Sequence, residues 1–376
     1  MGGMSSALSS TATYLDRLTR ARAVMAERSV DVLLLSVGSD LPYLSGYEAM
    51  PLERLTMLVV PRDGEATLVI PRLEAPRVAE QPGVFSLRSW NETDDPVAIV
   101  AALAGHPAVA AVGDTMWARF LVDLLGHWPT SETRYVRSVE VMNALRTRKD
   151  AAEIAALQAA GAAADRVAAQ LHAGEIALVG RTEAQVSADI SARLIAEGHD
   201  VVNFAIVAAG ENAASPHHRA GDRVIREDEI VLTDFGGTMA GYCSDITRCV
   251  FTGEPTAEVA QAYAVLHAAQ AAGVQAGVVG AACQDVDRAA RQVIADAGYG
   301  EYFIHRTGHG IGMEAHEDPY MVEGNDQPIE PGHAFSVEPG IYVAGKWGMR
   351  LEDIVVATDA GPLSMNHANH ALVSIT

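Results

Sequence analysis

The chain has few cysteines and no block of basic residues, and each shortage argues against a class of protein. Cys243, Cys249 and Cys283 are an odd number with no CxxC pair, so neither a disulfide framework nor a thiolate zinc site is expected. Such cysteine usage fits a reducing cytosol. The 48 acidic residues outnumber the 27 basic ones and give a net charge of −21, which argues against a nucleic-acid partner and against binding to an anionic membrane surface.

Long hydrophobic runs are also nearly absent. The first residues, MGGMSSALSSTATYLDRL, lack the apolar segment of a secretory signal, so we expect a cytoplasmic protein. One uncharged stretch, residues 259–284, is longer than the roughly 18 residues needed to span a membrane, but it is mostly Ala and Gly with four Gln and one His. This composition predicts a buried or half-buried helix instead.

At 376 residues the chain exceeds the size at which one hydrophobic core usually stops growing, so two domains are expected. Strands alternate with helices in residues 1–142, which predicts an α/β domain with a mixed sheet. In residues 143–376 a long Ala-rich helix begins at Asn143, and helices and strands then come in separate runs, which favours an α+β domain. Helices expected at 151–171 and 258–275, each followed by a second helix and an acidic strand or hairpin, suggest an internal duplication.

Two aspartates mark the first candidate site, in the segment LTDFGGTMAGYCSDITRC of residues 232–249. A hairpin whose turn centres on Met239 and Ala240 would place Asp234 directly opposite Asp245. Opposed residues in such a hairpin have Cβ atoms about 4.5–5.5 Å apart, so their carboxylates repel each other unless a proton or a cation lies between them. Asp234 also lies in an apolar strand with no Lys or Arg nearby, where an unpaired carboxylate is costly to bury. The pair therefore predicts a cation site.

Two glutamates repeat this pattern in the segment FSVEPGIYVAGKWGMRLEDIVV. A turn centred on Gly345 would place Glu338 opposite Glu352 on one face of a second hairpin, with Pro339 at the strand end. A single acidic residue in a strand is more often simply solvated, which is what we expect of Asp353. Two hairpins that each present an inward acidic pair are an uncommon pattern, and four carboxylates are too many for one catalytic zinc.

A nitrogen ligand is expected from the segment HRTGHGIGMEAHEDP, which contains His305, His309 and His316. A lone histidine is more often an ordinary core or surface residue than a ligand. The glycines on both sides of His309, however, leave the chain free of side chains there, as close approach to a site requires. His309 is therefore the predicted ligand. An oxygen-rich site with one imidazole suits Mn²⁺, Co²⁺, Fe²⁺ or Zn²⁺, and two such cations sharing a water are typical of hydrolytic sites.

Four motifs occur in order: SDITRC after a strand-borne aspartate, GHGIGMEAHEDP, SVEPGIY and GMRLEDIV. Together they resemble the metallopeptidase family of methionine aminopeptidases, X-prolyl aminopeptidases and prolidases, and the resemblance covers essentially the whole chain. It implies the family's pita-bread fold for residues 143–376, whose pseudo-twofold repeat would explain the duplication. For residues 1–142 it implies the creatinase/prolidase N-terminal accessory domain, through which relatives commonly dimerise, and hence a homodimer.

The resemblance also implies a set of five metal ligands. Asp234 resembles the chelating ligand of one metal ion, and Asp245 resembles a ligand that bridges both. His309 and Glu338 resemble ligands of the other ion, and Glu352 resembles the second bridge.

Catalytic roles follow from the same motifs. His217 and His316 resemble the two histidines that face the substrate and stabilise the tetrahedral intermediate. Glu338, besides binding metal, would relay a proton to the leaving nitrogen. Arg350 resembles an arginine found beside the ligands in the proline-directed members. His305 stays open between a place near the metals and a structural role.

The function implied is metal-dependent hydrolysis of the peptide bond before proline, with Mn²⁺ as the first choice of metal and Co²⁺, Zn²⁺ or Fe²⁺ as alternatives. Chain length and the short accessory domain favour a prolidase that cleaves Xaa-Pro dipeptides. Tyr320 stands where some prolidases have an arginine that could hold the dipeptide carboxylate, so an X-prolyl aminopeptidase acting on longer peptides stays open. The fold also occurs in metal-free creatine hydrolases and non-catalytic binding proteins, but these lose some of the five ligands that this chain keeps.

Overall fold

The computed structural model describes residues 10–375, which form two compact units divided between Arg146 and Thr147. The expected division was at residue 142, but residues 143–146 complete helix α6 (Val139–Arg146) of the first unit. The single long helix expected from Asn143 is wrong. A separate helix, α7 (Ala151–His172), begins after a break because the Asp150 carboxylate accepts hydrogen bonds from the Ala152 and Glu153 amides and so caps a new helix start.

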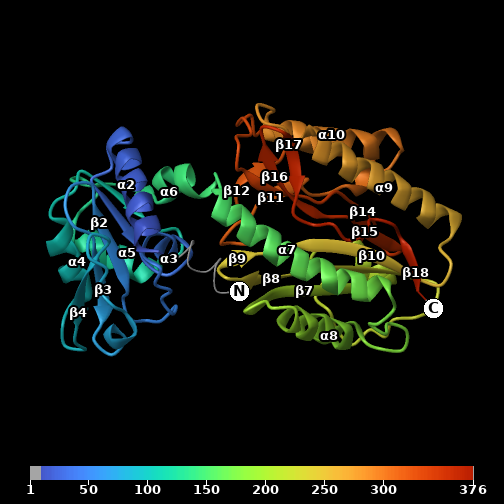
Figure 1. Ribbon diagram of the computed structural model, residues 1–376, viewed down its shortest axis with the longest axis horizontal. Helices are drawn as coiled ribbons and strands as arrows, with labels where there is room; N and C mark the ends of the chain where they lie inside the picture. The colour runs from blue at the N-terminus through green and yellow to red at the C-terminus, as the bar shows by residue number, and fades with distance from the viewer. Residues whose placement is uncertain (1–9, 376) are drawn as a thin grey trace. The chain divides into compact units, whose positions relative to one another are not determined.

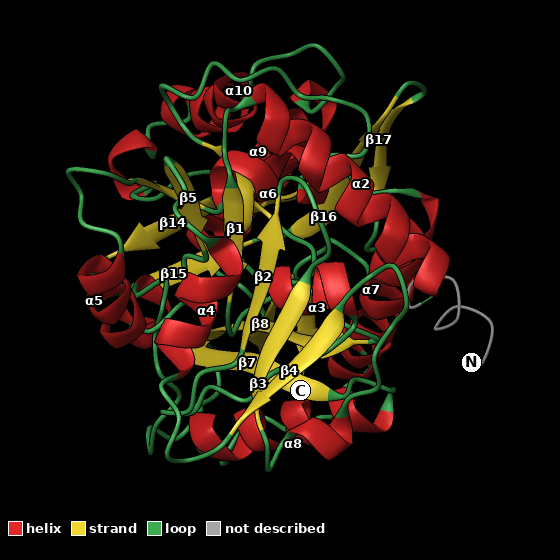
Figure 2. Ribbon diagram, turned by 90° about the vertical axis from the view of Figure 1, so that its left-hand side faces the viewer, coloured by secondary structure: helices red, strands yellow, loops and turns green. Residues whose placement is uncertain are grey.

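The first unit is the predicted α/β domain with one mixed sheet (Figures 1 and 2). The strands occur in the order β4-β3-β2-β1-β5-β6, and only the β1–β2 and β2–β3 pairs are antiparallel. The strands are β1 (Val32–Leu35), β2 (Met57–Pro61), β3 (Thr67–Pro71), β4 (Ser86–Trp90), β5 (Val109–Val112) and β6 (Arg134–Arg137). The remaining helices are α2 (Thr11–Glu27), α3 (Asp40–Ser45), η1 (Ala75–Arg77), α4 (Pro96–Ala104) and α5 (Ala118–His127).

Successive apolar side chains along the strands point to opposite sides, so both faces of this sheet are apolar. Val32 and Leu34 of β1 form one core cluster with Val100 of α4 and Phe120 of α5, so these two helices cover that face. Helix α4 starts where it does because Asp95 accepts hydrogen bonds from the Val97 and Ala98 amides, with Pro96 at the first helical position.

The second unit contains two similar halves (Figure 1). In the first half, α7 and α8 (Glu183–Ala196) precede a sheet of order β18-β10-β8-β7, with β9 paired to β8. Its elements are β7 (Val201–Ala209), η2 (Gly210–Ala214), β8 (Ile230–Met239), β9 (Tyr242–Cys243), β10 (Ile246–Thr252) and, from the chain's end, β18 (Val373–Ile375).

The second half repeats this plan, as the expected duplication requires. Helices α9 (Ala257–Ala276) and α10 (Cys283–Asp296) precede a sheet of order β12-β11-β13-β16-β17. Its elements are η3 (Gly300–Tyr302), β11 (Gly308–Gly310), β12 (Glu317–Met321), β13 (Ala334–Val337), the β14 (Gly340–Val343) and β15 (Trp347–Arg350) hairpin, β16 (Asp353–Thr358) and β17 (Gly361–Ser364).

The predicted register of the first hairpin is wrong. Asp234 lies opposite Thr247, not opposite Asp245. The turn centres on Ala240 and Gly241, which both have positive φ (50° and 83°), the geometry of a tight hairpin turn in which glycine is favoured. Asp245 then falls between β9 and β10, where the chain is free of ladder pairing and its side chain can turn toward the site.

The predicted register of the second hairpin is confirmed. Gly340 pairs with Arg350 and Val337 pairs with Asp353, so Glu338 and Glu352 lie across from each other where one ladder ends and the next begins. Asp353, expected to be solvated, is instead 2% exposed, and Arg248 Nη2 lies 2.7 Å from its carboxylate.

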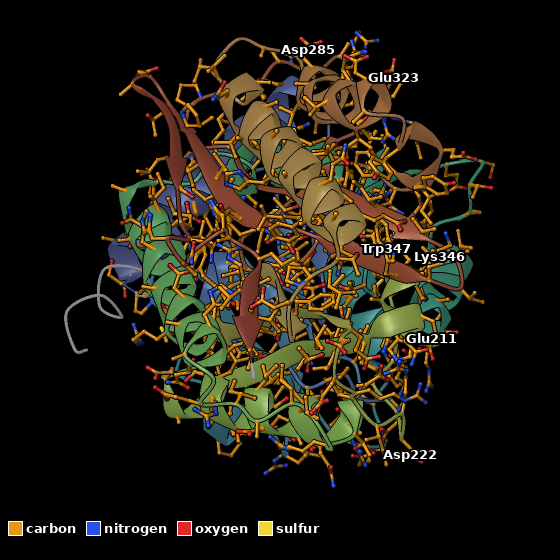
Figure 3. All side chains as sticks on the ribbon, turned by 90° about the vertical axis from the view of Figure 1, so that its right-hand side faces the viewer. Glu211, Asp222, Asp285, Glu323, Lys346 and Trp347 are labelled. Carbon is orange, nitrogen blue, oxygen red and sulfur yellow. The ribbon has the colours of Figure 1, made fainter. Side chains whose placement is uncertain are left out.

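The uncharged stretch forms most of α9 and the start of α10, and α9 buries one side in a core cluster that contains residues of both halves of the unit. Among residues 10–375, every helix is too short or too polar to cross a lipid bilayer. Acidic side chains such as Glu211, Asp222, Asp285 and Glu323 lie at the periphery of this unit, so part of the acidic excess is solvated surface (Figure 3).

Candidate active site

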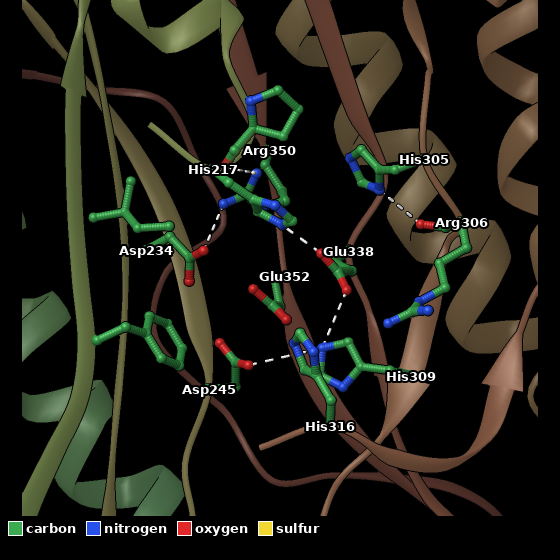
Figure 4. A pocket seen from close by; sticks show the side chains of 13 residues that line it. His217, Asp234, Asp245, His305, Arg306, His309, His316, Glu338, Arg350 and Glu352 are labelled. Atoms are coloured by element: carbon green, nitrogen blue, oxygen red, sulfur yellow. Dashed lines mark hydrogen bonds and ion pairs between the residues drawn. The ribbon is translucent and has the colours of Figure 1, made fainter. Parts of the chain in front are cut away.

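The two acidic hairpins and the histidine-rich segment meet at a cavity of about 510 Å³ within the second unit. All eight residues singled out in the sequence line this cavity (Figure 4): His217, Asp234, Asp245, His309, His316, Glu338, Arg350 and Glu352. They come from both halves of the duplicated fold, so neither half contains the whole cluster.

Asp234 and Asp245 are buried with unsatisfied oxygen atoms. They are 7% and 3% exposed, and their Oδ1 atoms are buried without a hydrogen-bond partner among the described residues. A buried carboxylate oxygen without a partner costs free energy that a bound cation would offset. These two atoms are therefore direct structural support for a cation at this position.

His309 presents Nε2 to the acids. Its Nδ1 lies 3.0 Å from the Gly310 carbonyl and donates to it, which leaves Nε2, 3.2 Å from Glu338 Oε1 and 3.9 Å from Asp245 Oδ2, as a potential ligand atom. The flanking glycines are required by packing, because a Cβ on Gly308 would collide with the backbone carbonyl of Ser336.

Glu352 connects the two hairpins. Its backbone forms an isolated bridge with Thr247, and the Thr247 hydroxyl donates to Glu352 Oε2 at 2.7 Å. Potential ligand atoms of Asp245, His309 and Glu352 all lie within 4.8 Å of one another, a grouping that fits a metal ion. The residues that could hold a metal are thus already close together.

Electrostatics in the cluster also fits divalent cations. Burial, followed by repulsion from Glu352, Asp234 and Glu338, raises the pKa of Asp245 well above its usual value. Burial and the charges of Glu338 and Asp234 likewise raise the pKa of Glu352. Positive charge placed among these acids would relieve both effects, and hard oxygen ligands with one imidazole are suited to Mn²⁺-like ions.

Arg350 is the one basic group already committed to this cluster among the described residues. Its Nη2 lies 2.5 Å from Asp234 Oδ2, its Nε donates to the Thr247 hydroxyl at 3.1 Å, and its Nη1 donates to the Tyr342 hydroxyl at 2.9 Å. Nη1 also donates to the Pro216 carbonyl at 3.2 Å, which fixes the loop that carries His217. Arg350 therefore occupies one oxygen of Asp234 and leaves Oδ1 available.

The remaining histidines have different surroundings. The ring centroids of His309 and His316 are 4.0 Å apart, and burial together with the charge of His309 lowers the pKa of His316 to about 4. His217 is exposed at the cavity, whereas its neighbour His218 lies 2.7 Å from Glu183 and belongs to the scaffold. His305 also lines the cavity, but both of its ring nitrogens are engaged, by the Tyr342 hydroxyl and by the Arg306 carbonyl, so neither is available as a metal ligand.

Several residues that line or support the cavity were not predicted from the sequence. Arg306 lines it beside His305, and the hydroxyls of Tyr342 and Thr247 hold Arg350 in place. The apolar side of the cavity is formed by Phe204, Ile206 and Pro216. For Arg306 a signal was present, because it is a basic residue three positions before the predicted ligand His309. The apolar residues lie in ordinary strand and loop patterns that gave no signal.

A cavity that gathers four carboxylates and an imidazole from two halves of a duplicated α+β fold defines a metal-dependent hydrolase. The chain matches metallopeptidase family M24 over residues 155–359, and the creatinase/prolidase N-terminal domain over residues 17–147. It belongs to this metallopeptidase family, with an α/β accessory domain and a pita-bread catalytic domain, as the motifs predicted.

Relatives match along nearly their full length. The probable dipeptidase PepE of Mycobacterium tuberculosis is 46% identical over 370 residues, covering 96% of each chain. The Xaa-Pro dipeptidase of Lactobacillus delbrueckii subsp. lactis is 34% identical over 355 residues, covering 93% of this chain and 96% of the relative. The crystal structure of dipeptidase PepE from Mycobacterium ulcerans superposes with a TM-score of 0.92 at 46% identity, covering 98% of this chain and 99% of that one.

Proposed function

We propose that this protein is a dinuclear-metal-dependent dipeptidase that hydrolyses Xaa-Pro dipeptides. The observation that carries the proposal is the buried cluster in which two aspartate oxygens, beside His309 and Glu352, have no hydrogen-bond partner within residues 10–375. Relatives that match nearly the whole chain are named probable dipeptidase and Xaa-Pro dipeptidase, which supports the substrate class.

Five residues would hold two divalent cations. We assign Asp234 to one ion, His309 and Glu338 to the other, and Asp245 and Glu352 to both. Mn²⁺ is the first choice, with Co²⁺, Zn²⁺ or Fe²⁺ as alternatives that the same ligands accept. When bound, such ions lower the pKa of a water molecule and polarise the scissile carbonyl.

Glu338 is the proposed proton carrier. It stands beside His309 at the cavity, where it would accept a proton from the attacking water and deliver it to the proline nitrogen as the peptide bond breaks. Its hydroxyl neighbour Ser336 donates to Oε1 at 3.2 Å and helps fix the carboxylate's orientation.

His217 and His316 are proposed to bind the reacting carbonyl and the substrate backbone. Because the pKa of His316 lies near 4, its imidazole is neutral at neutral pH and can donate one N–H without adding charge. His217 lies on a loop that Arg350 holds through the Pro216 carbonyl, so its approach to the cavity is set by the same arginine that orients Asp234. Donors placed for the developing oxyanion stabilise the transition state more than the ground state.

The test is a panel of Xaa-Pro dipeptides assayed with Mn²⁺ for the wild type and for Glu338→Ala. The wild type should cleave several members, and the variant should lose nearly all activity while remaining folded by circular dichroism. If Glu338→Ala cleaves Xaa-Pro as fast as the wild type, the assigned role of Glu338 is wrong. A clean preparation that binds none of Mn²⁺, Co²⁺ or Zn²⁺ would instead favour a binding protein.

A second candidate is an X-prolyl aminopeptidase that removes the first residue from longer peptides. Tyr320 favours it, since no arginine stands at that position to hold a dipeptide carboxylate. Rates for Xaa-Pro and Xaa-Pro-Xaa under identical metal loading separate the two functions.

We also propose a cytoplasmic homodimer. The three cysteines are buried free thiols, which suits a reducing compartment. Sedimentation at several concentrations tests the dimer.

A further inference from the structure

The cavity contains an arginine, Arg306, that has no acidic partner among the described residues. Arg306 is half-buried and lines the cavity, and its guanidinium carbon lies 4.3 Å from the centre of the Tyr320 ring. Within residues 10–375, no acidic side chain lies within ion-pair distance of it, although the cavity holds four carboxylates. Figure 4 shows its side chain extending into the space beside Glu338 and His309.

The other arginine of the cavity is not free to bind an anion. All three nitrogens of the Arg350 guanidinium already donate within the protein, to Asp234, Thr247, Tyr342 and the Pro216 carbonyl. Stacking on a tyrosine ring, in contrast, leaves the in-plane N–H groups of Arg306 unused. Arg306 is therefore the positive group that an incoming anion can reach.

A chain of hydrogen bonds fixes the backbone at Arg306. Arg350 can only donate, so the Tyr342 hydroxyl accepts from it and passes its own hydrogen to His305 Nε2 at 2.8 Å. His305 Nδ1 then carries the remaining proton and donates to the Arg306 carbonyl at 2.7 Å. Arg291 Nη2 also donates to the His305 carbonyl, at 2.7 Å. The backbone of Arg306 is thus linked through hydrogen bonds to Arg350, the arginine that orients Asp234.

We propose that Arg306 binds the free C-terminal carboxylate of the substrate and thereby makes the site selective for dipeptides. This inference rests on the proposed function and names the residue that sets substrate length. A planar guanidinium matches a carboxylate with two parallel charge-assisted hydrogen bonds. Tyr320 contributes by holding the guanidinium in place from the neighbouring strand, so the absence of an arginine at that position does not leave the carboxylate without a partner.

Arg306 can distinguish substrates by their length because the carboxylate of a dipeptide lies one residue after the scissile bond. In a tripeptide, a neutral amide occupies that place and the carboxylate lies about 3.5 Å farther along an extended chain. An amide cannot form the charged, two-fold interaction with Arg306. The contact with the Arg306 guanidinium should therefore disfavour both longer peptides and peptides with a blocked C-terminus.

The experiment compares Ala-Pro with Ala-Pro amide in the Mn²⁺-loaded full-length enzyme. Arg306→Gln should lower kcat/KM for the free acid by about 10–100-fold, mainly through KM, and change kcat/KM for the amide by less than about threefold. Arg306→Lys keeps the charge and should recover part of the loss. Arg288→Gln is the matched control, since Arg288 pairs with Glu323 at the periphery of the unit and should affect neither substrate (Figure 3).

Two results would overturn the inference. One is an equal loss for acid and amide in Arg306→Gln, which would indicate a purely structural role. The other is an unchanged KM for the acid. A wild type that cleaves no Xaa-Pro peptide would refute the proposed function separately. The acid and amide of whichever dipeptide it does cleave would then be compared, with the same loss expected on the acid alone, and a protein that cleaves no dipeptide refutes both.

Discussion

Arg350 and Asp234 form a buried ion pair between the two acidic hairpins, with Nη2 and Oδ2 2.5 Å apart and Arg350 only 2% exposed. The two carboxylate oxygens of Asp234 therefore differ: the guanidinium binds Oδ2, while Oδ1 has no partner among the described residues. An arginine placed this way orients a candidate metal ligand and removes part of the repulsion within the acidic cluster.

Replacing Arg350 with lysine tests this orientation. Lysine keeps the positive charge but cannot donate at once to Asp234, Thr247 and Tyr342, so Asp234 should lose its fixed direction. We expect metal affinity and kcat/KM to fall by about 10–100-fold, as is usual when a partner of a metal ligand is lost. Isothermal titration with Mn²⁺ measures the affinity, and an unaltered binding constant would contradict the orienting role.

Asp245→Asn should separate stability from metal binding. Burial and the neighbouring acids raise the pKa of Asp245. When folding raises the pKa of a carboxyl group, the protein loses stability as the pH rises above the pKa of that group in the unfolded chain, here near 3.8. At pH 7 and without metal, the neutral amide should therefore stabilise the protein by about 1–3 kcal/mol. The same variant should lose the stabilisation that Mn²⁺ gives the wild type. Thermal unfolding with EDTA and with Mn²⁺ measures both effects, and a variant less stable than wild type in EDTA would refute the argument.

His172, at the end of α7, predicts a second pH effect. Neither ring nitrogen has a hydrogen-bond partner among the described residues, and burial together with the charge of Arg248 lowers its pKa to about 4. Between about pH 6.5 and 4 the unfolded chain binds a proton that the folded chain does not, so stability falls as the pH falls through this window.

His172→Leu removes that penalty. The substitution should raise the free energy of unfolding at pH 5 by about 1–2 kcal/mol more than it does at pH 8, because the variant no longer has this titrating group. Urea unfolding at both pH values measures the difference, with His367→Leu at an exposed position as the control. Equal effects of the two substitutions would show that His172 does not titrate as described.

Gly308→Ala tests why His309 stands between glycines. A Cβ at Gly308 would meet the Ser336 carbonyl of the adjacent strand, so the two strands must move apart and the histidine ring with them. We expect a loss of about 2–4 kcal/mol in stability together with weaker metal binding. Gly126→Ala, in α5 with open space around it, should be neutral or slightly stabilising. If Gly308→Ala unfolds like wild type, the strands tolerate the methyl group.

Much of the site could be predicted because its chemistry is local. Asp234 lies in strand β8, and Glu338 and Glu352 lie directly beside short strands, each within a recognisable motif. The Gly345 turn sets the register of the second hairpin through the strands that flank it. The first hairpin was harder, because the positive φ at Ala240 and Gly241 selects a turn one residue later than expected.

Other features depend on contacts between distant segments, which no local pattern reveals. Asp353 was expected in solvent, yet Arg248, Gln270 and His370 surround its carboxylate from β10, α9 and the C-terminal segment. The proposed role of Arg306 likewise depends on its stacking against Tyr320, a contact that the sequence pattern does not reveal.

The most direct test of the central claim is a metal titration of Xaa-Pro hydrolysis. Protein stripped with a chelator and then dialysed should be inactive, and activity should rise with added Mn²⁺ and level off at two ions per chain. The Asp245→Asn variant should stay inactive throughout. Full Xaa-Pro hydrolysis by stripped protein, or no hydrolysis at any metal loading, would contradict the account.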